Sequence, residues 1–501
     1  MKNETIGARI ARLRESMGMT QTDLAKKLKT TQSAVARIEA GGQNVSTDML
    51  RKISSVLHCN LLGSSPGSVN LSIEGGVPLS GTIETNTSKN GAVGLLCASL
   101  LNRNQTILRR VPRIEEVNRL LEVLVSIGVR YEWIKNDIKI TPPTKFDLSK
   151  LDNEAARRTR IMILLIGSIT HFLDAFSLPQ SGGCHLGSRA VRPHFYALEN
   201  FGINIKTTED AYFVTKKRKH VAEVILYESG DTVTENAILA AALTPRKTVI
   251  KYASANYMVQ ELCIFLQNCG VTIEGVGTTT LEVTGLKEIN KPIDYTLDED
   301  PTDSMFFITA GIVTGSTLTV TRCPIDFLEL ELLKLKKMGL SFALGAEYKS
   351  HNGRTRLVDI TIKPSRLKAL EEKIYGRPYP GLNIDNVPFF AVIATQAEGQ
   401  TLIHDWVYEK RAIYFTELDR LGADTMLADP HRIFITGPTK LIPSEMVCPP
   451  ALRPASVLLI AMLAAKGKSV LRNIYSINRG YEKMVIRLRK IGAKIDYLDE
   501  F

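Results

Sequence analysis

LVSIGVRYEW (Leu124–Trp133) is one of six related phrases that decide the fold of this chain. In each copy, apolar residues at helical spacing stop at a glycine, and a strand-like run follows. Glycine ends helices well because it adopts the left-handed backbone conformation without strain. Each copy therefore predicts a strand–helix–strand unit, and the repeat predicts an architecture built from six of them. The other copies are ALENFGINI (197–205), LQNCGVTIEG (266–275), LKKMGLSFAL (335–344), LDRLGADTML (418–427) and LRKIGAKIDY (488–497).

The spacing of the repeat is that of a small supersecondary unit. Successive glycines are separated by 74, 68, 69, 83 and 70 residues. Six such units with apolar helices cannot stack as a solenoid, so two lobes of three units each are the more economical arrangement. The glycines concerned are Gly128, Gly202, Gly270, Gly339, Gly422 and Gly492.

The composition indicates a water-soluble protein with a sizeable core. The chain has 501 residues, of which 44% are hydrophobic. Its N-terminus has no apolar signal region, and apolar runs such as Ile161–Ile166 are far shorter than the ~20 residues of a membrane span. Seven cysteines form no CxxC pair and no metal-ligand spacing. We therefore expect a cytosolic protein with no membrane partner and mostly buried thiols.

The positive charge of the chain is concentrated at its N-terminus. The formal net charge is +11, and residues 1–60 hold ten Lys or Arg against five acids. This excess favours an anionic partner for the first segment. A solvated basic helical face is the alternative on charge alone.

The same segment carries four short amphipathic helical patterns, with Thr20 placed to cap the second and Thr30 or Thr31 the third. Residues 6–57 resemble the Cro/C1-repressor (XRE) type of helix-turn-helix domain. The resemblance rests on Met19-Thr20-Gln21, on Leu24-Ala25 and on Gln32–Glu39 (QSAVARIE) followed by Gly41.

Such a resemblance implies DNA binding, with the second helix of the pair in the major groove. The implied contacts are Gln32, Ser33 and Arg37 on base edges or backbone, and Gln21 on a phosphate. Domains of this type usually dimerise on two-fold sites, so a homodimer is one expected state. The alternative is a helical module kept for dimerisation only. We expect an all-α domain over residues 1–60 and a polar linker over 61–70.

From about Leu71 to the end, the chain resembles the enolpyruvyl transferases. This resemblance implies an α/β fold of two lobes, an inside-out barrel of six repeated units with helices inside and sheets outside. We expect this domain over 71–501, with lobe A at about 89–298 and lobe B at 71–88 plus 299–501. The closer likeness is to members that act on UDP-N-acetylglucosamine.

The resemblance carries a phosphoenolpyruvate site. Lys89 matches a hinge lysine that binds phosphoenolpyruvate, and Arg453 and Arg479 match two further cations of the same site. The loop Ser177–Arg189 (SLPQSGGCHLGSR) resembles the family's active-site loop. In it Cys184 is implied as the general acid, and Arg189 as the arginine that follows the reacting phosphate. Several cations are what a nearly trivalent anion requires.

The acceptor side is implied by a second set of residues. These are Asn90 on the sugar, together with Arg160, Arg192, His194 and Arg411. Asp385, in Asn383–Pro388 (NIDNVP), matches the aspartate that deprotonates the acceptor hydroxyl. The implied reaction is addition followed by elimination of phosphate, with no metal and no organic cofactor.

Three positions depart from the family pattern. Ala451 and Arg192 replace aspartates, and Asn118 stands at the position of a hinge-proximal aspartate. The changes disturb the acceptor side more than the phosphoenolpyruvate side. Three functions therefore stay open: transfer to UDP-N-acetylglucosamine in peptidoglycan synthesis, transfer to another nucleotide such as UMP, and a DNA-binding regulator that senses ligands. Asp300 and Asp303 are either structural or near the nucleotide.

Overall fold

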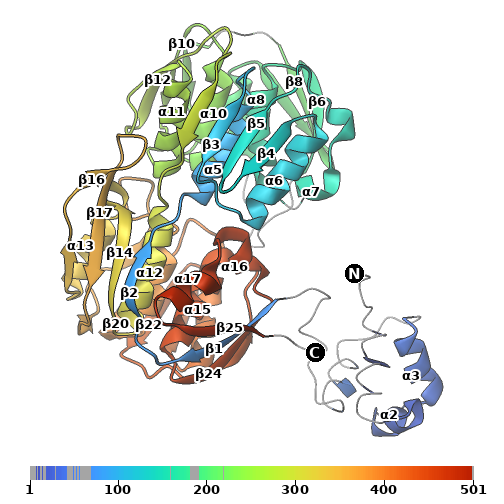
Figure 1. Ribbon diagram of the computed structural model, residues 1–501, viewed down its shortest axis with the longest axis vertical. Helices are drawn as coiled ribbons and strands as arrows, with labels where there is room; N and C mark the ends of the chain where they lie inside the picture. The colour runs from blue at the N-terminus through green and yellow to red at the C-terminus, as the bar shows by residue number, and fades with distance from the viewer. Residues whose placement is uncertain are drawn as a thin grey trace.

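The computed structural model describes residues 7, 10, 11, 14, 19–28, 30–41, 49, 52, 53, 56, 69–157, 159–180, 191–217, 219 and 221–498, and the backbone alone of Arg160. Figure 1 shows two lobes of mixed helix and sheet, and a smaller helical part formed by the N-terminal residues. Each of the three parts has its own cluster of buried apolar side chains. None of the described helices has the length and apolar content that crossing a membrane requires.

The N-terminal part contains α2 (Gln21–Leu28) and α3 (Gln32–Glu39). Thr20 and Asp23 cap α2 reciprocally, since each side chain accepts a hydrogen bond from the other residue's amide. The Thr31 hydroxyl accepts from the amide of Ala34 at the start of α3. The caps expected at Thr20 and Thr31 are thus confirmed.

Lobe A, defined by a buried cluster that runs from Ala92 to Leu297, has three sheets. Their strands, in spatial order, are β13 (Ile293–Thr296), β3 (Thr106–Arg109), β5 (Asp137–Thr141) and β4 (Arg130–Ile134); β6 (Ala175–Pro179), β8 (Ala211–Lys216) and β7 (Ile203–Thr207); and β11 (Thr272–Glu274), β12 (Thr280–Thr284), β10 (Lys247–Lys251) and β9 (Glu223–Ile225).

Lobe B, whose buried cluster joins Leu71–Ile83 to Met305–Ile495, also has three sheets. One contains β23 (Glu445–Val447), β24 (Gly467–Arg472), β1 (Asn70–Gly75) and β25 (Lys494–Leu498). The second contains β15 (Phe342–Leu344), β17 (Arg356–Ile362), β14 (Thr317–Pro324) and β2 (Ser80–Glu84), with β16 (Tyr348–Lys349) beside β17. The third contains β18 (Leu367–Lys368), β20 (Ala397–His404), β22 (Arg432–Gly437) and β21 (Asp424–Asp429), with β19 (Ile374–Tyr375) beside β20.

The six repeat glycines adopt the left-handed backbone conformation that their phrases predict. All have positive φ, between 76° and 101°. The strand after each glycine, β4, β7, β11, β15, β21 or β25, belongs to a different one of the six described sheets. The preceding helices are α6 (Glu115–Ser126), α9 (Arg192–Glu199), α11 (Tyr257–Asn268), α13 (Glu329–Lys337), the 3₁₀ segment η4 (Ala412–Leu421) and α17 (Met484–Lys490). One unit therefore uses a 3₁₀ segment where an α-helix was expected.

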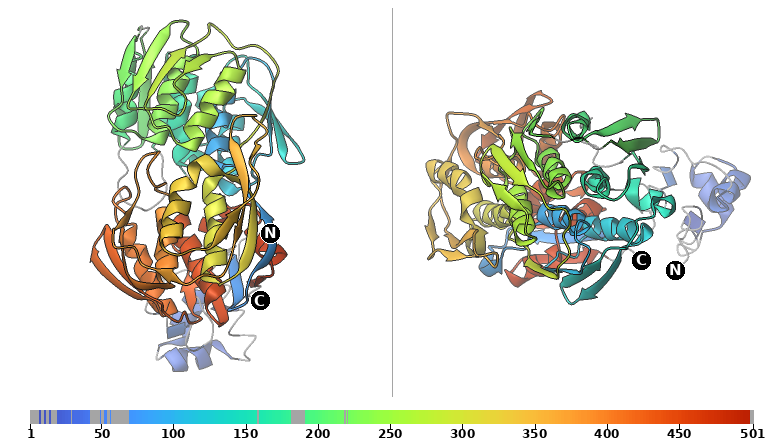
Figure 2. Two further views of the ribbon diagram at one scale, coloured as in Figure 1. Left: turned by 90° about the vertical axis from the view of Figure 1, so that its left-hand side faces the viewer. Right: turned by 90° about the horizontal axis from the view of Figure 1, so that it is seen from above.

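Each unit also has an inner helix that the repeated phrase does not include. These helices are buried on nearly every side, so they show no amphipathic period. They are α5 (Lys89–Ser99), α8 (Leu164–Ile169), α10 (Asp231–Ala242), α12 (Pro301–Val313), α14 (Val387–Ala394) and α15 (Leu452–Ala464). Figure 2 shows helices at the centre of the lobes and sheets outside, which confirms the expected inside-out architecture. The remaining helical segments are α7 (Asn153–Arg157), α16 (Tyr475–Gly480), η1 (Leu148–Lys150), η2 (Arg160–Ile163) and η3 (Ile325–Phe327).

Within its described residues, the chain passes between the lobes twice, and the two passages pair with each other. The Ser88 amide donates to the carbonyl of Asp298, and the Asp300 amide donates to that of Asn86, each at 2.8 Å. Between these bonds lies the buried side chain of Glu299. Its Oε1 accepts from Arg110 of lobe A at 2.8 Å and from Arg322 of lobe B at 2.7 Å.

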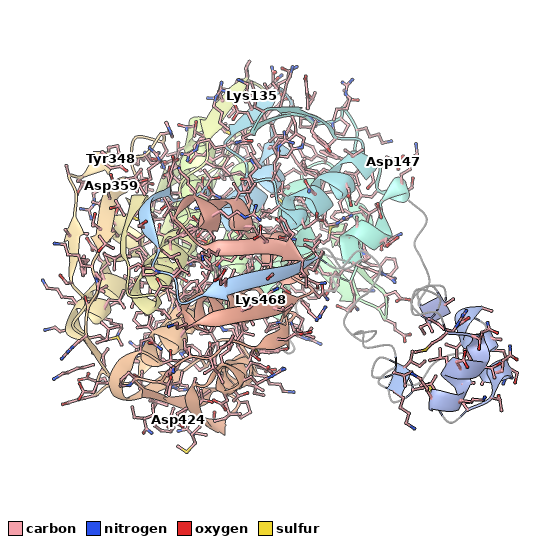
Figure 3. All side chains as sticks on the ribbon, turned by 60° about the horizontal axis from the view of Figure 1, so that its bottom comes forward. Lys135, Asp147, Tyr348, Asp359, Asp424 and Lys468 are labelled. Carbon is pink, nitrogen blue, oxygen red and sulfur yellow. The ribbon has the colours of Figure 1, made fainter. Side chains whose placement is uncertain are left out.

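The lobe-B arginine of this pair is itself held in place. The Arg322 amide donates to the Tyr348 hydroxyl at 2.9 Å and to the Asp359 carboxylate at 3.1 Å. Tyr348 in turn donates to Asp359, and Figure 3 shows the two side chains together at the edge of the lobe. The passage between the lobes is therefore tied to the sheet of β14 and β17.

Gly202→Ala should destabilise lobe A more than a positive φ alone explains. Gly202 has φ 76°, and a Cβ there would lie 2.1 Å from the carbonyl oxygen of Lys217. Gly315 has φ 61° and nothing within 4 Å of its Cβ position, so Gly315→Ala is the matched control. We expect about 1–2 kcal/mol of destabilisation for the control and clearly more for Gly202→Ala, measured by thermal and urea unfolding. Equal losses in the two variants would contradict the packing argument.

Candidate active site

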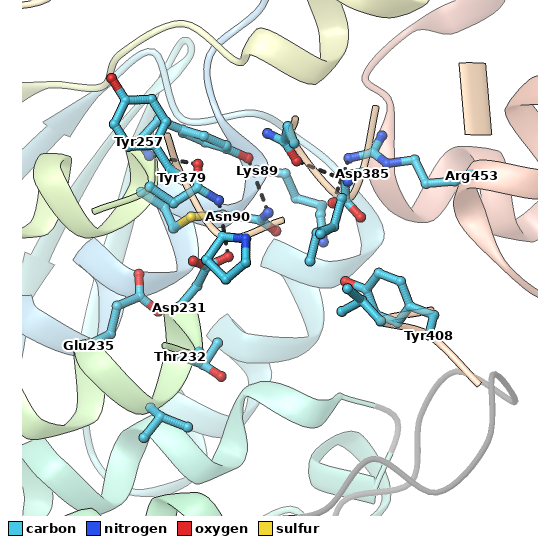
Figure 4. A pocket seen from close by; sticks show the side chains of 18 of the residues that line it. Lys89, Asn90, Asp231, Thr232, Glu235, Tyr257, Tyr379, Asp385, Tyr408 and Arg453 are labelled. Atoms are coloured by element: carbon cyan, nitrogen blue, oxygen red, sulfur yellow. Dashed lines mark hydrogen bonds and ion pairs between the residues drawn. The ribbon is translucent and has the colours of Figure 1, made fainter. Parts of the chain in front are cut away.

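A cavity of about 860 Å³ lies between residues of the two lobes. Its lining combines lobe-A residues of α5, α6, α9, α10 and α11 with lobe-B residues from the segments 326–331, 377–385, 406–411 and 452–479. Figure 4 shows side chains from both groups pointing into the same space. Seven residues predicted from the sequence line this cavity: Lys89, Asn90, His194, Asp385, Arg411, Arg453 and Arg479.

The other predicted site residues are not among the lining. Cys184 and Arg189 lie outside the described residues, and so does the side chain of Arg160. Arg192 is exposed in the first turn of α9 and does not line the cavity. Asp300 and Asp303 do not line it either.

Asp300 and Asp303 have structural roles instead. The Asp300 carboxylate caps α12 by accepting from the amide of Thr302. Asp303 forms a buried ion pair with Arg487, with bonds of 2.6 and 2.7 Å, and also accepts from the Asn86 amide. Of the two interpretations of these aspartates, the structure supports the structural one.

Asp385 carries the only carboxylate among the described residues that lies within 4 Å of both Arg411 and Arg453. Arg453 Nη2 is 3.2 Å from Asp385 Oδ2, and Arg411 Nη1 is 3.6 Å from Oδ1. Burial raises the pKa of this carboxyl group, but the two guanidinium groups oppose burial and lower the pKa to about 2. Asp385 is therefore ionised at neutral pH.

The loop that bears Asp385 is fixed by neighbouring side chains. The Asp385 amide donates to Asn383 Oδ1 at 2.9 Å. Next to it, Asn386 Nδ2 donates at 2.8 Å to the buried carboxylate of Glu331 on α13. Arg411 Nη2 reaches the carbonyl of Ile384 at 2.6 Å. These bonds fix the backbone that carries the Asp385 side chain.

Arg453 has three side-chain partners although Ala451 supplies no carboxylate. Nη1 donates to the Tyr481 hydroxyl and Nη2 to the Thr302 hydroxyl, both at 2.8 Å. Together with Asp385, these groups hold the guanidinium at the start of α15. Ala451 itself is the buried N-cap residue of that helix, with no side-chain cap.

Lys89 and Asn90 begin α5, and each has a partner in lobe A. Lys89 Nζ lies 2.7 Å from Glu116 Oε2, and Asn90 Nδ2 donates to the Tyr257 hydroxyl at 3.1 Å. Asn118 stands where the family pattern has a carboxylate near the hinge. The structure instead gives Lys89 a carboxylate from Glu116, two residues earlier.

The lobe-A wall of the cavity is formed by α9 and α10. The ring of His194 is bonded to Thr232 at 3.3 Å and to Asn236 at 3.2 Å. One oxygen of Glu235, also on this wall, is buried with no hydrogen-bond partner among the described residues, and burial raises the pKa of this group well above its usual value. No group of three or more His, Cys, Asp or Glu side chains in the described part of the chain is arranged to hold a metal ion.

The predicted DNA contacts share the exposed side of α3. Gln32, Ser33 and Arg37 are exposed, while Val35 and Ile38 face the small core. Gln21 is half-buried: its Nε2 donates to Glu39 at 2.9 Å, and its Oε1 accepts from Gln32 Nε2 at 2.7 Å. Gln21 therefore supports Gln32 in this structure.

Sequence reasoning missed several residues that build the site. They are Tyr257, Glu116 and Glu331, which lie 167, 27 and 55 positions from the residues they contact, and Asp405, which lies six positions from Arg411. The cap formed by Asn256 could have placed Tyr257 at a helix start. No signal in the sequence links the other three to Lys89, Arg411 or Asn386.

Comparison with known proteins assigns the family. A sequence profile of the EPSP synthase (3-phosphoshikimate 1-carboxyvinyltransferase) family matches residues 73–488. The chain belongs to this family. A helix-turn-helix profile matches residues 10–63.

Curated relatives in the family carry the name UDP-N-acetylglucosamine 1-carboxyvinyltransferase. The protein of Treponema denticola is 35% identical over 428 residues, which is 85% of this chain and 98% of that protein. The protein of Bradyrhizobium diazoefficiens is 30% identical over 435 residues, again 85% and 98%. Nearly the whole length of each relative is therefore represented here.

Solved structures show the same fold. The enolpyruvyl transferase NikO from Streptomyces tendae superposes with a TM-score of 0.75 at 24% identity, covering 87% of this chain and 100% of NikO. EPSP synthase from Acinetobacter baumannii gives a TM-score of 0.66 at 18% identity, covering 86% and 100%. The two-lobed fold is thus shared over most of the chain.

Asp405→Asn should destabilise lobe B strongly. Arg411 is 1% exposed, and its Nη2 donates to Asp405 Oδ1 at 2.8 Å. Without the carboxylate a buried guanidinium charge loses its main partner, which costs about 3–5 kcal/mol. The exposed pair Arg420–Glu417 supplies the control, Glu417→Gln, which should leave the thermal midpoint unchanged. Equal midpoints for the two variants would show that the buried pair contributes no more than a surface pair.

Proposed function

We propose that the protein transfers the enolpyruvyl group of phosphoenolpyruvate to the 3-hydroxyl of UDP-N-acetylglucosamine and releases phosphate. The observation that carries this proposal is the position of Asp385, next to Arg411 and Arg453 in a cavity that Lys89 and Asn90 also line. Curated relatives that align along nearly their whole length carry the name of this activity.

The cations of the cavity support binding of phosphoenolpyruvate. Lys89, Arg453 and Arg479 line it together. The Nε of Arg479 is buried and has no hydrogen-bond partner among the described residues. A phosphate or carboxylate oxygen would supply that partner and remove the cost of an unsatisfied donor. We assign Arg189 to the same anion on the resemblance of its loop.

The reaction divides into addition and elimination. In the addition, Cys184 gives its proton to the methylene carbon, the acceptor oxygen bonds to C2, and Asp385 takes the hydroxyl proton. In the elimination, the C2–O bond to phosphate breaks, and the Cys184 thiolate left by the addition takes a proton from the new methyl group, which restores the double bond. The arginines stabilise charge on the carboxylate and the departing phosphate.

The low pKa of Asp385 depends on the charges around it. Burial raises this pKa, and the positive charges of Arg453, Arg411 and Lys89 lower it. An anion bound to these cations offsets part of their field and raises the pKa of the carboxyl group. Phosphoenolpyruvate binding therefore turns Asp385 into a stronger base.

The acceptor would lie against the remaining predicted residues. His194 is fixed by Thr232 and Asn236 on the lobe-A wall. Arg411 lies on the opposite side, next to Asp385. We assign Asn90 and Arg160 to the acceptor on the resemblance of their segments, but not Arg192, which is exposed and does not line the cavity.

A second function is favoured by the helix-turn-helix profile at residues 10–63. We propose that residues 1–60 bind duplex DNA through α3, that 61–70 form a linker, and that 71–501 form the transferase. Gln32, Ser33 and Arg37 would contact DNA, with Gln21 supporting Gln32. A two-fold operator would bring two copies of the chain together.

The test of the transferase is phosphate release from phosphoenolpyruvate, with UDP-N-acetylglucosamine and UMP as parallel acceptors. We expect release with the sugar nucleotide, and a loss of at least about 100-fold in Cys184→Ser and in Asp385→Ala. Asp424→Ala, exposed on β21, is the control and should keep full activity. Release with UMP alone would show that the acceptor is UMP and not UDP-N-acetylglucosamine. Release with neither, from protein that binds the sugar nucleotide, would leave a ligand sensor.

The DNA-binding proposal predicts a salt-dependent effect of one arginine. Arg37→Ala should weaken binding to duplex DNA and reduce the slope of log K against log salt by about one. Lys337→Ala, exposed on α13 of lobe B, keeps the same net charge as that variant and should bind like the wild type. Fluorescence anisotropy at several salt concentrations makes the comparison. Equal slopes in both variants would remove Arg37 from the interface.

A further inference from the structure

Tyr257 is a cavity residue that the reaction above leaves without a role. It is the first residue of α11 and is 5% exposed. Its amide donates to Asn256 Oδ1 at 2.9 Å, and Asn256 Nδ2 donates to Asp231 at 3.1 Å. The backbone that carries the ring is therefore anchored to the N-terminus of α10.

The ring itself is held from the other lobe. It meets Phe327 of η3 edge to face, with centroids 5.9 Å apart and planes at 66°. Phe327 in turn packs against Tyr379 at 5.2 Å. Rings in such contacts have preferred orientations. The contacts with Phe327 and Tyr379 therefore restrict the orientation of the Tyr257 ring, and with it the position of the hydroxyl.

The hydroxyl meets Asn90. Its oxygen accepts a hydrogen bond from Asn90 Nδ2 at 3.1 Å (Figure 4). Burial raises the pKa of Tyr257 well above its usual value, so the phenol stays neutral. An amide side chain has donors on one end and an acceptor on the other. With Nδ2 given to Tyr257, the remaining end of Asn90 is the carbonyl oxygen.

No group in the described part of the chain donates to Asn90 Oδ1, and Asn90 lines the cavity. We propose that Tyr257 is a positioning residue, which acts through Asn90 by fixing its amide so that the carbonyl oxygen accepts a hydrogen bond from the acceptor substrate. The acceptor then presents a hydroxyl or an amide N–H at this point. A phosphate or carbonyl oxygen there would face another acceptor.

This inference rests on the proposed function, since it places the acceptor substrate next to Asn90. It also deepens that proposal, because it states which hydrogen-bonding chemistry the acceptor must offer. A positioning role and a purely structural role for Tyr257 predict different results. A structural role predicts lost stability, whereas a positioning role predicts a selective loss on the acceptor side.

Tyr257→Phe tests the proposal while keeping the ring and its contact with Phe327. We expect the KM for UDP-N-acetylglucosamine to rise by about tenfold, as for the loss of one oriented hydrogen bond. The KM for phosphoenolpyruvate should stay within about twofold. Tyr252→Phe, five residues earlier and 61% exposed, is the matched control and should change neither constant. Equal rises in both constants, or no rise, would overturn the proposal.

A double-mutant cycle tests the route through Asn90. If Tyr257 acts only by fixing the amide, Asn90→Ala with Tyr257→Phe should be no worse in kcat/KM than Asn90→Ala alone, within about twofold. Losses that multiply would mean that Tyr257 acts independently of Asn90 and would overturn the proposal. Thermal unfolding of each variant identifies any that has lost its fold. If the double variant is unfolded, the single variants Asn90→Ala and Tyr257→Phe can still be compared with the wild type.

Calorimetric binding separates this inference from the proposed function. UDP-N-acetylglucosamine and UMP are titrated into the wild type and into Tyr257→Phe. If the wild type binds a nucleotide without turnover, the transferase proposal fails, and a tenfold weaker binding by the variant still supports the role of Tyr257. Equal affinities overturn that role. A wild type that binds neither nucleotide would reject both proposals.

Discussion

Glu299 is a buried carboxylate that takes one arginine from each lobe, and the cavity between the lobes depends on it. Arg110 comes from lobe A and Arg322 from lobe B, and both reach the same oxygen atom. The residue lies in one of only two passages of the described chain between the lobes, and those passages pair through backbone hydrogen bonds. A buried carboxylate with two guanidinium partners is costly to separate. Lys89 and Asn90 lie on lobe A, and Asp385 lies on lobe B. Their relative position therefore depends on how this arrangement holds the two lobes together.

The cavity shows how several cations are held close together in one fold. Like charges repel each other, so each needs an internal partner. Lys89 has Glu116, Arg411 has Asp405, and Arg453 has the hydroxyls of Thr302 and Tyr481 as well as Asp385. Arg479 keeps one buried nitrogen unpaired. The carboxylates and hydroxyls thus offset the repulsion between the cations that line the cavity.

Several parts of the fold and site follow from local sequence. The six glycines have the positive φ that their phrases indicate, because a helix that ends before a strand needs a left-handed residue. Thr20 and Thr31 cap the helices they precede. The resemblance of short phrases to those of a known family predicts that five residues share one site. All five line the same cavity: Lys89, Asn90, Asp385, Arg453 and Arg479. The inner helices escaped the repeat, since a helix buried on all sides has no polar face to mark its period.

Other features depend on contacts between distant segments, which no local pattern encodes. Asn118 was singled out as a missing carboxylate, yet Glu116 supplies one to Lys89, because a helix turns its residues by about 100° each and only the packed helix shows which of them faces α5. Tyr257 meets Asn90 across 167 positions of sequence. The sequence by itself determined the repeat, the caps, the basic helix-turn-helix segment and the residue types of the site, since these depend on backbone preference and local charge. The tertiary structure alone decided which carboxylate neutralises which cation and which hydroxyl orients Asn90, because those energies depend on distances of a few ångströms between side chains that folding brings together.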